Sequence, residues 1–406
     1  MVKKSEFIWN TIASISASAL SAVLLLITTR INGVDDAGMF SIAFASATVL
    51  NAIADYGMRV FQVTDTERKY GFDVYLSARW VVVMLMMAAA LIYTFFSGYT
   101  PVKAAVCICL TGFRFVDALS ETFQGEFQLN NRLDIAGKSV FFRMAASISV
   151  FLAVDGMTRN ILISCLAMVA ANLIVMCVFD VKLIKNYVKL SISRETGAIK
   201  KVLLECFPLF FSTFLNLYII NAPKYAIDRM LSYEMQTYFN ILYLPTFTIN
   251  LMSIFVLKPM LLSLGIMWNE KKYKKFGGII AKMALSIVVL TFVVEAGSAL
   301  VGIPLLSIIF GVNLEPFKSS LLILILSGGF SALSVVLFYA LTTMRCQKKV
   351  SFAYIAAAVA GFILPGIMVS AYKITGAAIS SVLISIILFL GLLIIFIYEG
   401  KRQIKK

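Results

Sequence analysis

The sequence predicts an all-α integral membrane protein with about twelve transmembrane helices. Hydrophobic residues make up 60% of the 406 positions and charged residues only 14%, and the mean hydropathy is +0.91. A soluble chain of this length has no interior large enough to bury so much apolar surface. Long apolar runs such as 319–344 and 374–398 lack the strict alternation of a transmembrane β-strand. Because backbone groups in lipid must bond within their own segment or in a closed barrel, these runs indicate helices.

Charged breaks between the apolar runs divide the chain into its predicted spans. About 20 mainly apolar residues are needed to cross roughly 30 Å of hydrocarbon. The first run is too long for a signal peptide, and Gly33–Gly38 does not resemble a cleavage site, so we interpret it as a retained span. The predicted spans are 7–29, 38–60, 75–97, 101–121, 136–155, 160–180, 202–224, 236–258, 278–302, 318–343, 351–371 and 375–398.

The net charge of +15 gives these spans an orientation. With the N-terminus inside, 28 of the 36 Lys and Arg residues flank the spans on one side, 7 flank them on the other, and Arg114 lies within the membrane. The positive-inside rule then places both termini in the cytoplasm. The basic residues lie in short loops beside spans, so we expect no nucleic-acid partner.

Several classes of chemistry are excluded by what the sequence lacks. It contains no histidine, which excludes His-based proton relays and Ser-His or Cys-His nucleophiles. The six cysteines lie in or beside apolar spans without the spacing of zinc ligands, and no P-loop motif for ATP is found. We therefore expect no metal, no cofactor and no disulfide. A membrane enzyme is a weaker alternative, because the loops are short and no Asp-x-Asp motif occurs.

The longest polar connection, 181–201, lies near the midpoint and divides the chain into two halves of six spans. Six spans return the chain to its starting side, so both halves enter the membrane with the same orientation. This arrangement permits a parallel repeat with a cavity between two bundles. We predict two six-helix bundles, residues 1–190 and 191–406, around a central cavity.

Arg114 is the strongest anomaly within a predicted span. It lies eleven residues past Lys103, or about 16 Å deep by the rise of a helix. A charge at that depth costs at least ~2.5–3.5 kcal/mol and should face a partner or a wet cavity. Asp117 and Glu121 follow on the same helix face. Two interpretations are open: a structural ion pair, or a cationic site for a phosphate-bearing substrate beside a carboxylate that can titrate.

Other charged and polar residues in spans are further candidates. Glu295 is alone in its span and could couple transport to protons, although a structural partner on another helix is the alternative. Asp55 with Arg59 and Lys224 with Asp228 are spaced as i,i+4 pairs, which could also be merely interfacial. Polar residues recur at helical spacing in the first span, where small residues would equally serve close helix packing. Asn216 lies on a polar face of the seventh span.

The sequence resembles bacterial polysaccharide flippases over essentially its whole length, most densely in the first, second, seventh and eighth predicted spans. The resemblance begins with Phe7-Ile-Trp-Asn10 and Thr28-Thr-Arg-Ile-Asn-Gly33 and extends to Asp36-Ala-Gly-Met-Phe40, Tyr56-Gly57 and Phe61-Gln-Val-Thr-Asp65. It is also dense in Asn221-Ala-Pro-Lys-Tyr-Ala-Ile-Asp228, at Gln236 and in Pro245-Thr-Phe-Thr-Ile-Asn-Leu251. These flippases are the O-antigen and capsular repeat-unit exporters of the multidrug/oligosaccharidyl-lipid/polysaccharide (MOP) superfamily.

The resemblance implies a MATE-like fold of two six-helix bundles that works by alternating access in the bacterial inner membrane. The implied cargo is an undecaprenyl-diphosphate-linked oligosaccharide, moved from the cytoplasmic to the outer leaflet and coupled to an ion gradient. It also implies that Arg30, Lys224 and Asp228 have functional roles, and polysaccharide polymerase machinery is a candidate partner. With the residue-based reading, the expected substrate-binding residues are Arg30, Arg114, Lys224 and Asn216, and the ion-coupling candidates are Asp117, Glu295, Asp228 and Asp55. The main alternatives are a drug/cation antiporter and a peptidoglycan-precursor flippase.

Overall fold

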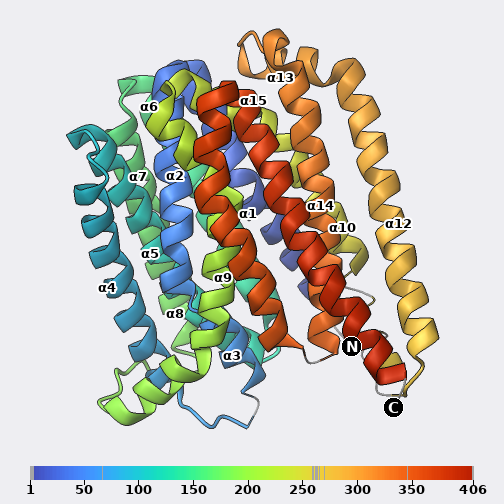
Figure 1. Ribbon diagram of the computed structural model, residues 1–406. Coiled ribbons are helices and arrows are strands. Elements are labelled where there is room, and N and C mark those ends of the chain that lie inside the picture. Colours follow the sequence, from blue (N-terminus) through green and yellow to red (C-terminus); the bar gives the residue numbers. More distant parts are fainter. Residues whose placement is uncertain are drawn as a thin grey trace. The chain divides into compact units, whose positions relative to one another are not determined.

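The computed structural model describes residues 4–65, 67–257, 260, 264, 266–268, 270–344 and 346–404, and in this part of the chain all regular structure is helical (Figure 1). The chain divides into two compact units, Met1–Leu217 and Tyr218–Lys406. The boundary falls within one long helix, α9 (Thr196–Met230), so this helix belongs to both units.

The first unit contains the helices that build the site described below. In α2 and α3, a predicted single span is interrupted where Tyr56 and Gly57 adopt left-handed backbone conformations, with φ of 50° and 65°. In chain order the helices are α1 (Lys4–Ile31), α2 (Val34–Asp55), α3 (Met58–Thr64), α4 (Phe72–Phe96), α5 (Pro101–Leu129), α6 (Leu133–Thr158), α7 (Ile161–Val175), the π-helical turn η1 (Met176–Val181), α8 (Lys182–Ile184) and the first part of α9.

The second unit begins with the remainder of α9. Its longest element, α15 (Gln347–Ile404), is interrupted at Lys373, where φ is 50° and ψ is −129°. This non-helical residue separates the predicted spans 351–371 and 375–398. The other elements are α10 (Tyr233–Leu257), α12 (Tyr273–Gly297), the π-helical turn η3 (Ser298–Gly302), α13 (Ile303–Phe310), the 3₁₀ turn η4 (Glu315–Phe317) and α14 (Lys318–Thr343).

The helices are long and apolar enough to make the chain a multi-pass membrane protein. Nine helical stretches of the described residues meet both criteria for crossing a membrane, and one of them, Lys349–Arg402, includes the break at Lys373. Helices α5 and α10 supply the two other predicted spans, with 29 and 25 residues. In the described residues each of the twelve predicted spans is therefore helical over most of its length, with a break at Tyr56 and Gly57 in the second.

Close packing of α1 on α6 depends on a glycine. A Cβ atom at Gly137 would lie 2.6 Å from the carbonyl carbon of Trp9 and 2.9 Å from the backbone nitrogen of Asn10. The two helix backbones therefore approach more closely than any side chain permits at this point. The small residue that permits this approach is on α6, so both interpretations of the polar residues in the first span stay open.

The loop between α3 and α4 holds the start of α9 within the first unit. The carboxylate of Asp65 accepts hydrogen bonds from the backbone N–H groups of Lys69 and Tyr70, at 2.9 and 3.0 Å, and from the hydroxyl of Tyr75 at 2.8 Å. Burial favours a higher pKa for Asp65, but these hydrogen bonds and the charge of Lys69 outweigh it and lower the pKa below its usual value. Glu205 of α9 accepts from Lys69 at 3.1 Å and from Tyr70 at 3.3 Å.

Candidate functional site

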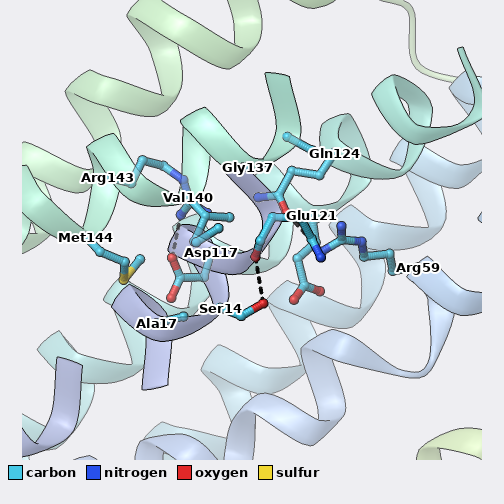
Figure 2. A pocket seen from close by; sticks show the side chains of 13 residues that line it. Ser14, Ala17, Arg59, Asp117, Glu121, Gln124, Gly137, Val140, Arg143 and Met144 are labelled. Atoms are coloured by element: carbon cyan, nitrogen blue, oxygen red, sulfur yellow. Dashed lines mark hydrogen bonds and ion pairs between the residues drawn. The ribbon is translucent and has the colours of Figure 1, made fainter. Parts of the chain in front are cut away.

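A charged cavity lies inside the first unit, between α1, α5 and α6, with one contribution from α3. Its volume is about 210 Å³. Figure 2 shows Met144 and Ala17 toward one end of the cavity, and Arg59, Glu121 and Gln124 toward the other. The complete lining consists of Asn10, Ala13, Ser14, Ala17, Arg59, Asp117, Glu121, Gln124, Ala136, Gly137, Val140, Arg143 and Met144.

Arg143 on α6 lies between two carboxylates. Its Nη1 donates to Asp117 Oδ1 at 2.5 Å and to Asn172 Oδ1 at 3.1 Å, and its Nε lies 3.9 Å from Asp180 Oδ2. The side chain is 3% exposed, and that of Asp180 is fully buried. Asp180 in turn accepts a hydrogen bond from Ser120 at 2.5 Å. A buried guanidinium is tolerated here because carboxylates surround it.

Arg114, the predicted intramembrane cation, belongs to the same cluster. Its Nη1 lies 3.4 Å from Asp117 Oδ2 and its Nη2 donates to Thr48 at 3.3 Å. The guanidinium also lies over the ring of Phe44, 4.9 Å from the centroid. Asp117 is thus shared by two arginines, and the shorter contact is with Arg143. The predicted Arg114–Asp117 pair is present, but it forms one side of a larger network.

A second buried arginine group lies next to this network. The fully buried side chain of Arg79 donates to the backbone carbonyls of Ala54 and Asp55 and to the hydroxyl of Thr122, and its Nη2 is 3.9 Å from Glu121 Oε2. Arg59 on α3 donates to Gln124 Oε1 at 2.9 Å.

The charges in this region balance. Four arginines (59, 79, 114 and 143) are matched by four carboxylates (55, 117, 121 and 180), with Arg59 acting electrostatically on both Asp55 and Glu121. Burying an unpaired charge in a membrane protein is expensive, whereas a compensated network is tolerated. The network therefore has a structural role whatever else it does.

The structure changes the interpretation of Asp55. The sequence predicted an i,i+4 pair with Arg59 on one helix, but α2 ends at Asp55 and Arg59 lies on α3. The prediction of a pair on a continuous helix face is wrong, because the left-handed Tyr56 and Gly57 break the helix between them. Arg59 instead forms its hydrogen bond with Gln124.

The other predicted site residues are divided between the units. Arg30, at the end of α1, is exposed, and Asn216 on α9 is half-buried; both belong to the first unit. Lys224, Asp228 and Glu295 are half-buried in the second unit. A single chamber lined by Arg30, Arg114 and Lys224 therefore stays a prediction.

Lys224 differs from the arginines of the first unit. Its ammonium lies over the ring of Tyr243 on α10, 5.3 Å from the centroid. No carboxylate of the described residues lies within 4 Å of it, including Asp228 one helical turn further along. Glu295 on α12 is similarly isolated, because its buried Oε2 accepts no hydrogen bond from a described residue.

Sequence reasoning missed the most buried arginines. Arg143 and Arg79 were both counted among the Lys and Arg residues that flank the spans on the cytoplasmic side. In the structure their side chains are only 3% and 0% exposed. A signal was present for Arg143, which lies seven residues inside the predicted span 136–155 and five residues past Lys138. Asn172 on α7 and Asp180 on η1 gave no comparable signal in the sequence.

Comparison with solved structures identifies the fold. The sequence matches no protein-family model and no curated protein. A lipid II flippase, MurJ, in an inward closed conformation matches with a TM-score of 0.73 at 12% identity, over 95% of this chain and 87% of that one. An inward-facing multidrug resistance MATE transporter of the MOP superfamily matches with a TM-score of 0.68 at 13% identity, over 96% and 94%. The bent form of the Vibrio cholerae MATE transporter VcmN matches with a TM-score of 0.61 at 11% identity, over 98% and 97%.

At these identities the likeness shows the fold. The predicted all-helical membrane fold of the MATE type is thereby confirmed, and the chain shares it along almost its whole length.

Proposed function

We propose that this chain is a flippase that moves an undecaprenyl-diphosphate-linked oligosaccharide from the cytoplasmic to the outer leaflet by alternating access. The fold that it shares with a lipid II flippase and with MATE transporters supports transport in general. The sequence resemblance to polysaccharide flippases supports this cargo in particular. The chain acts as a transporter in the bacterial inner membrane with both termini in the cytoplasm, and polysaccharide polymerase machinery is its expected partner.

The observation that carries the proposal is the isolation of Lys224. Arg114 and Arg143 of the first unit already contact Asp117, whereas among the described residues Lys224 makes a ring contact with Tyr243 and no ion pair. An ammonium without a counterion in a membrane interior favours an anionic ligand. A diphosphate meets that requirement, so this feature favours a phosphate-linked lipid over the cationic drugs of an antiporter.

The same reasoning ranks the other candidates. Arg30, Arg114 and Asn216 are the remaining proposed cargo contacts, with Arg114 the least available because Asp117 and Thr48 already contact it. Among the ion-coupling candidates, Asp117 already interacts with Arg143, Arg114 and Asn172. Glu295, whose buried oxygen accepts no described hydrogen bond, is the better candidate for coupling, ahead of Asp228 and Asp55.

The proposal is tested first by deletion. Cells without the protein should accumulate an undecaprenyl-linked oligosaccharide on the inner leaflet, and mass spectrometry of that lipid also identifies the cargo. If peptidoglycan precursors accumulate instead, the chain is a flippase for those precursors.

The residue test compares two substitutions of Lys224. Lys224→Met should weaken cargo binding and strongly reduce export, because the loss of a hydrogen bond to a charged group costs about 1.5–3 kcal/mol, or roughly 10- to 150-fold in cargo affinity. Lys224→Arg keeps the charge and should retain partial export. Lys282→Met, at an exposed position, is the control. Normal export by Lys224→Met, at equal protein level, would remove the anion site from the proposal.

A further inference from the structure

We propose that the cavity in the first unit is a binding site for a single neutral sugar residue of the cargo. This inference rests on the proposed function and adds a second binding site for the same cargo. The proposed function names Lys224 as the phosphate contact, and the present inference concerns only the part of the saccharide that would enter the cavity of the first unit.

The electrostatic balance of the cavity selects a neutral ligand. Two arginines, Arg59 and Arg143, and two carboxylates, Asp117 and Glu121, line it. Their formal charges cancel, so neither an anion nor a cation is favoured over a polar neutral molecule. The wall nevertheless has a high density of directional hydrogen-bonding groups.

Several of those groups have hydrogen-bonding capacity left over. Glu121, with a side chain 31% exposed, accepts no hydrogen bond from any described residue. The side-chain amide of Asn10 likewise has no described partner, and Arg59 uses only Nη1, toward Gln124. Ser14 donates to the carbonyl of Asn10 at 2.8 Å and can still accept. The cavity thus offers a carboxylate that accepts, a guanidinium that donates and an amide that does both, which is the set that neighbouring hydroxyl groups require.

The cavity also has apolar surface, which comes from α1 and α6. Ala13, Ala17, Ala136, Gly137, Val140 and Met144 complete the lining. A pyranose ring has hydroxyl groups around its edge and C–H groups on its faces, so it matches a cavity that combines polar groups with apolar surface. A small number of polar groups that orient a ligand on an apolar surface is the usual composition of a binding pocket.

The volume of the cavity limits its ligand to a single sugar residue. The volume of about 210 Å³ is below the roughly 300–1,000 Å³ of pockets that enclose drug-sized ligands. A whole oligosaccharide does not fit, and one sugar ring does. The rest of the saccharide must lie outside the cavity.

The test fills the cavity without changing its charge. Ala17 is exposed on the cavity wall, so Ala17→Phe adds volume without displacing a buried side chain. Ile15, two residues away on α1 and 53% exposed, lies outside the lining, and Ile15→Phe is the matched control. A second variant, Asn10→Ala, removes hydrogen bonds and leaves the space.

Binding is measured with the purified full-length chain in nanodiscs, using two probes. One is undecaprenyl diphosphate that carries a disaccharide of N-acetylglucosamine and a neutral hexose, and the other is undecaprenyl diphosphate without sugar. Ala17→Phe and Asn10→Ala should weaken binding of the first probe at least tenfold and leave binding of the second unchanged. The control variant should bind both probes like the unmodified chain.

The outcomes separate the two proposals. If Lys224→Met loses both probes while Ala17→Phe binds both normally, the cavity is not a sugar site and the flippase proposal stands. If Ala17→Phe weakens both probes equally, the cavity serves the phosphate or the fold and the sugar site is wrong. If sodium ions displace the sugar-bearing probe through Glu121, so that Glu121→Gln abolishes the sodium effect, the cavity is a cation site instead. If the unmodified chain binds neither probe, the proposed function itself fails.

Discussion

Arg143 contacts carboxylates on two helices, Asp117 on α5 and Asp180 on η1. Buried ion pairs of this kind add little stability relative to a well-packed apolar core, but removing one partner leaves the other charges uncompensated. Removing Arg143 alone should therefore destabilise the first unit, even though the intact network adds little relative to an apolar core.

Replacing Arg143 by methionine should destabilise the protein by about 3–5 kcal/mol, because Asp117 and Asp180 would lose their shared cation. Arg114→Ala should have a smaller effect, since Asp117 keeps its contact with Arg143. Thermal unfolding in detergent measures both, with the exposed Arg159→Met as the control. Equal melting temperatures for Arg143→Met and the unmodified protein would show that the cluster is not a structural network.

At this scale the sequence predicted part of the site. Arg114 and Asp117 could be found because an arginine deep in an apolar run must be compensated, and the nearest carboxylate follows one turn later. Arg143 and Asp180 could not be paired from the sequence, because 37 residues separate them and nothing local specifies that α6 packs against η1. The cavity was missed for the same reason, since its walls come from four different helices.

The helices themselves were largely predictable, because a span must be long, apolar and bounded by charge. The exceptions have local causes. The span predicted over 38–60 is broken at Tyr56 and Gly57, where the apolar pattern continues but the backbone turns left-handed. That break places Arg59 on α3, from where it donates to Gln124 on the cavity wall.

The α1–α6 contact gives a prediction at the level of elements. Gly137→Ala should destabilise the first unit by about 1–3 kcal/mol, because the added methyl group meets backbone atoms of Trp9 and Asn10 that have no rotamer to change. Gly156→Ala, on the same helix but with no atom within 4 Å of its added Cβ, is the control and should be neutral or slightly stabilising. Thermal unfolding measures both, and equal effects would mean that α1 and α6 do not pack at Gly137.

The loop around Asp65 gives a prediction on pH. Because the folded pKa of Asp65 is lowered, ionised Asp65 contributes stability above the unfolded pKa of about 3.9, and this contribution is lost as the pH falls through the lower folded value. Hydrogen exchange at the amides of Lys69 and Tyr70 should therefore stay slow down to about pH 4. In Asp65→Asn these amides should exchange faster at neutral pH. Unchanged protection in that variant would show that the carboxylate does not order the loop.

At the scale of the whole chain, composition and apolar run length predicted an all-helical membrane protein, and the resemblance to polysaccharide flippases implied the MATE-like fold. The division expected at residue 190 is a proposal about domains, and the compact units meet within α9. The sequence could not place this boundary, because α9 is apolar and helical on both sides of it.

Coupling of transport to an ion gradient is a property of the whole transport cycle, and substitution of Glu295 tests it. Glu295→Gln should block gradient-driven transport of the lipid-linked saccharide at least tenfold in proteoliposomes, because the amide cannot exchange a proton or bind a cation as the carboxylate does. Binding of the cargo should be retained. Glu315→Gln, at an exposed position, is the control. Transport at the normal rate by Glu295→Gln would assign Glu295 a structural role.

The balanced charges of the first unit also constrain how the protein is made. During synthesis Arg79 emerges before Glu121, and Asp117 emerges before Arg143. A span that entered lipid alone would expose an uncompensated charge at a cost of ~2.5–3.5 kcal/mol. Insertion of α4, α5 and α6 as a group would avoid this cost, so a ribosome that stalls after α5 should leave α4 associated with the insertion machinery for longer than one that stalls after α6.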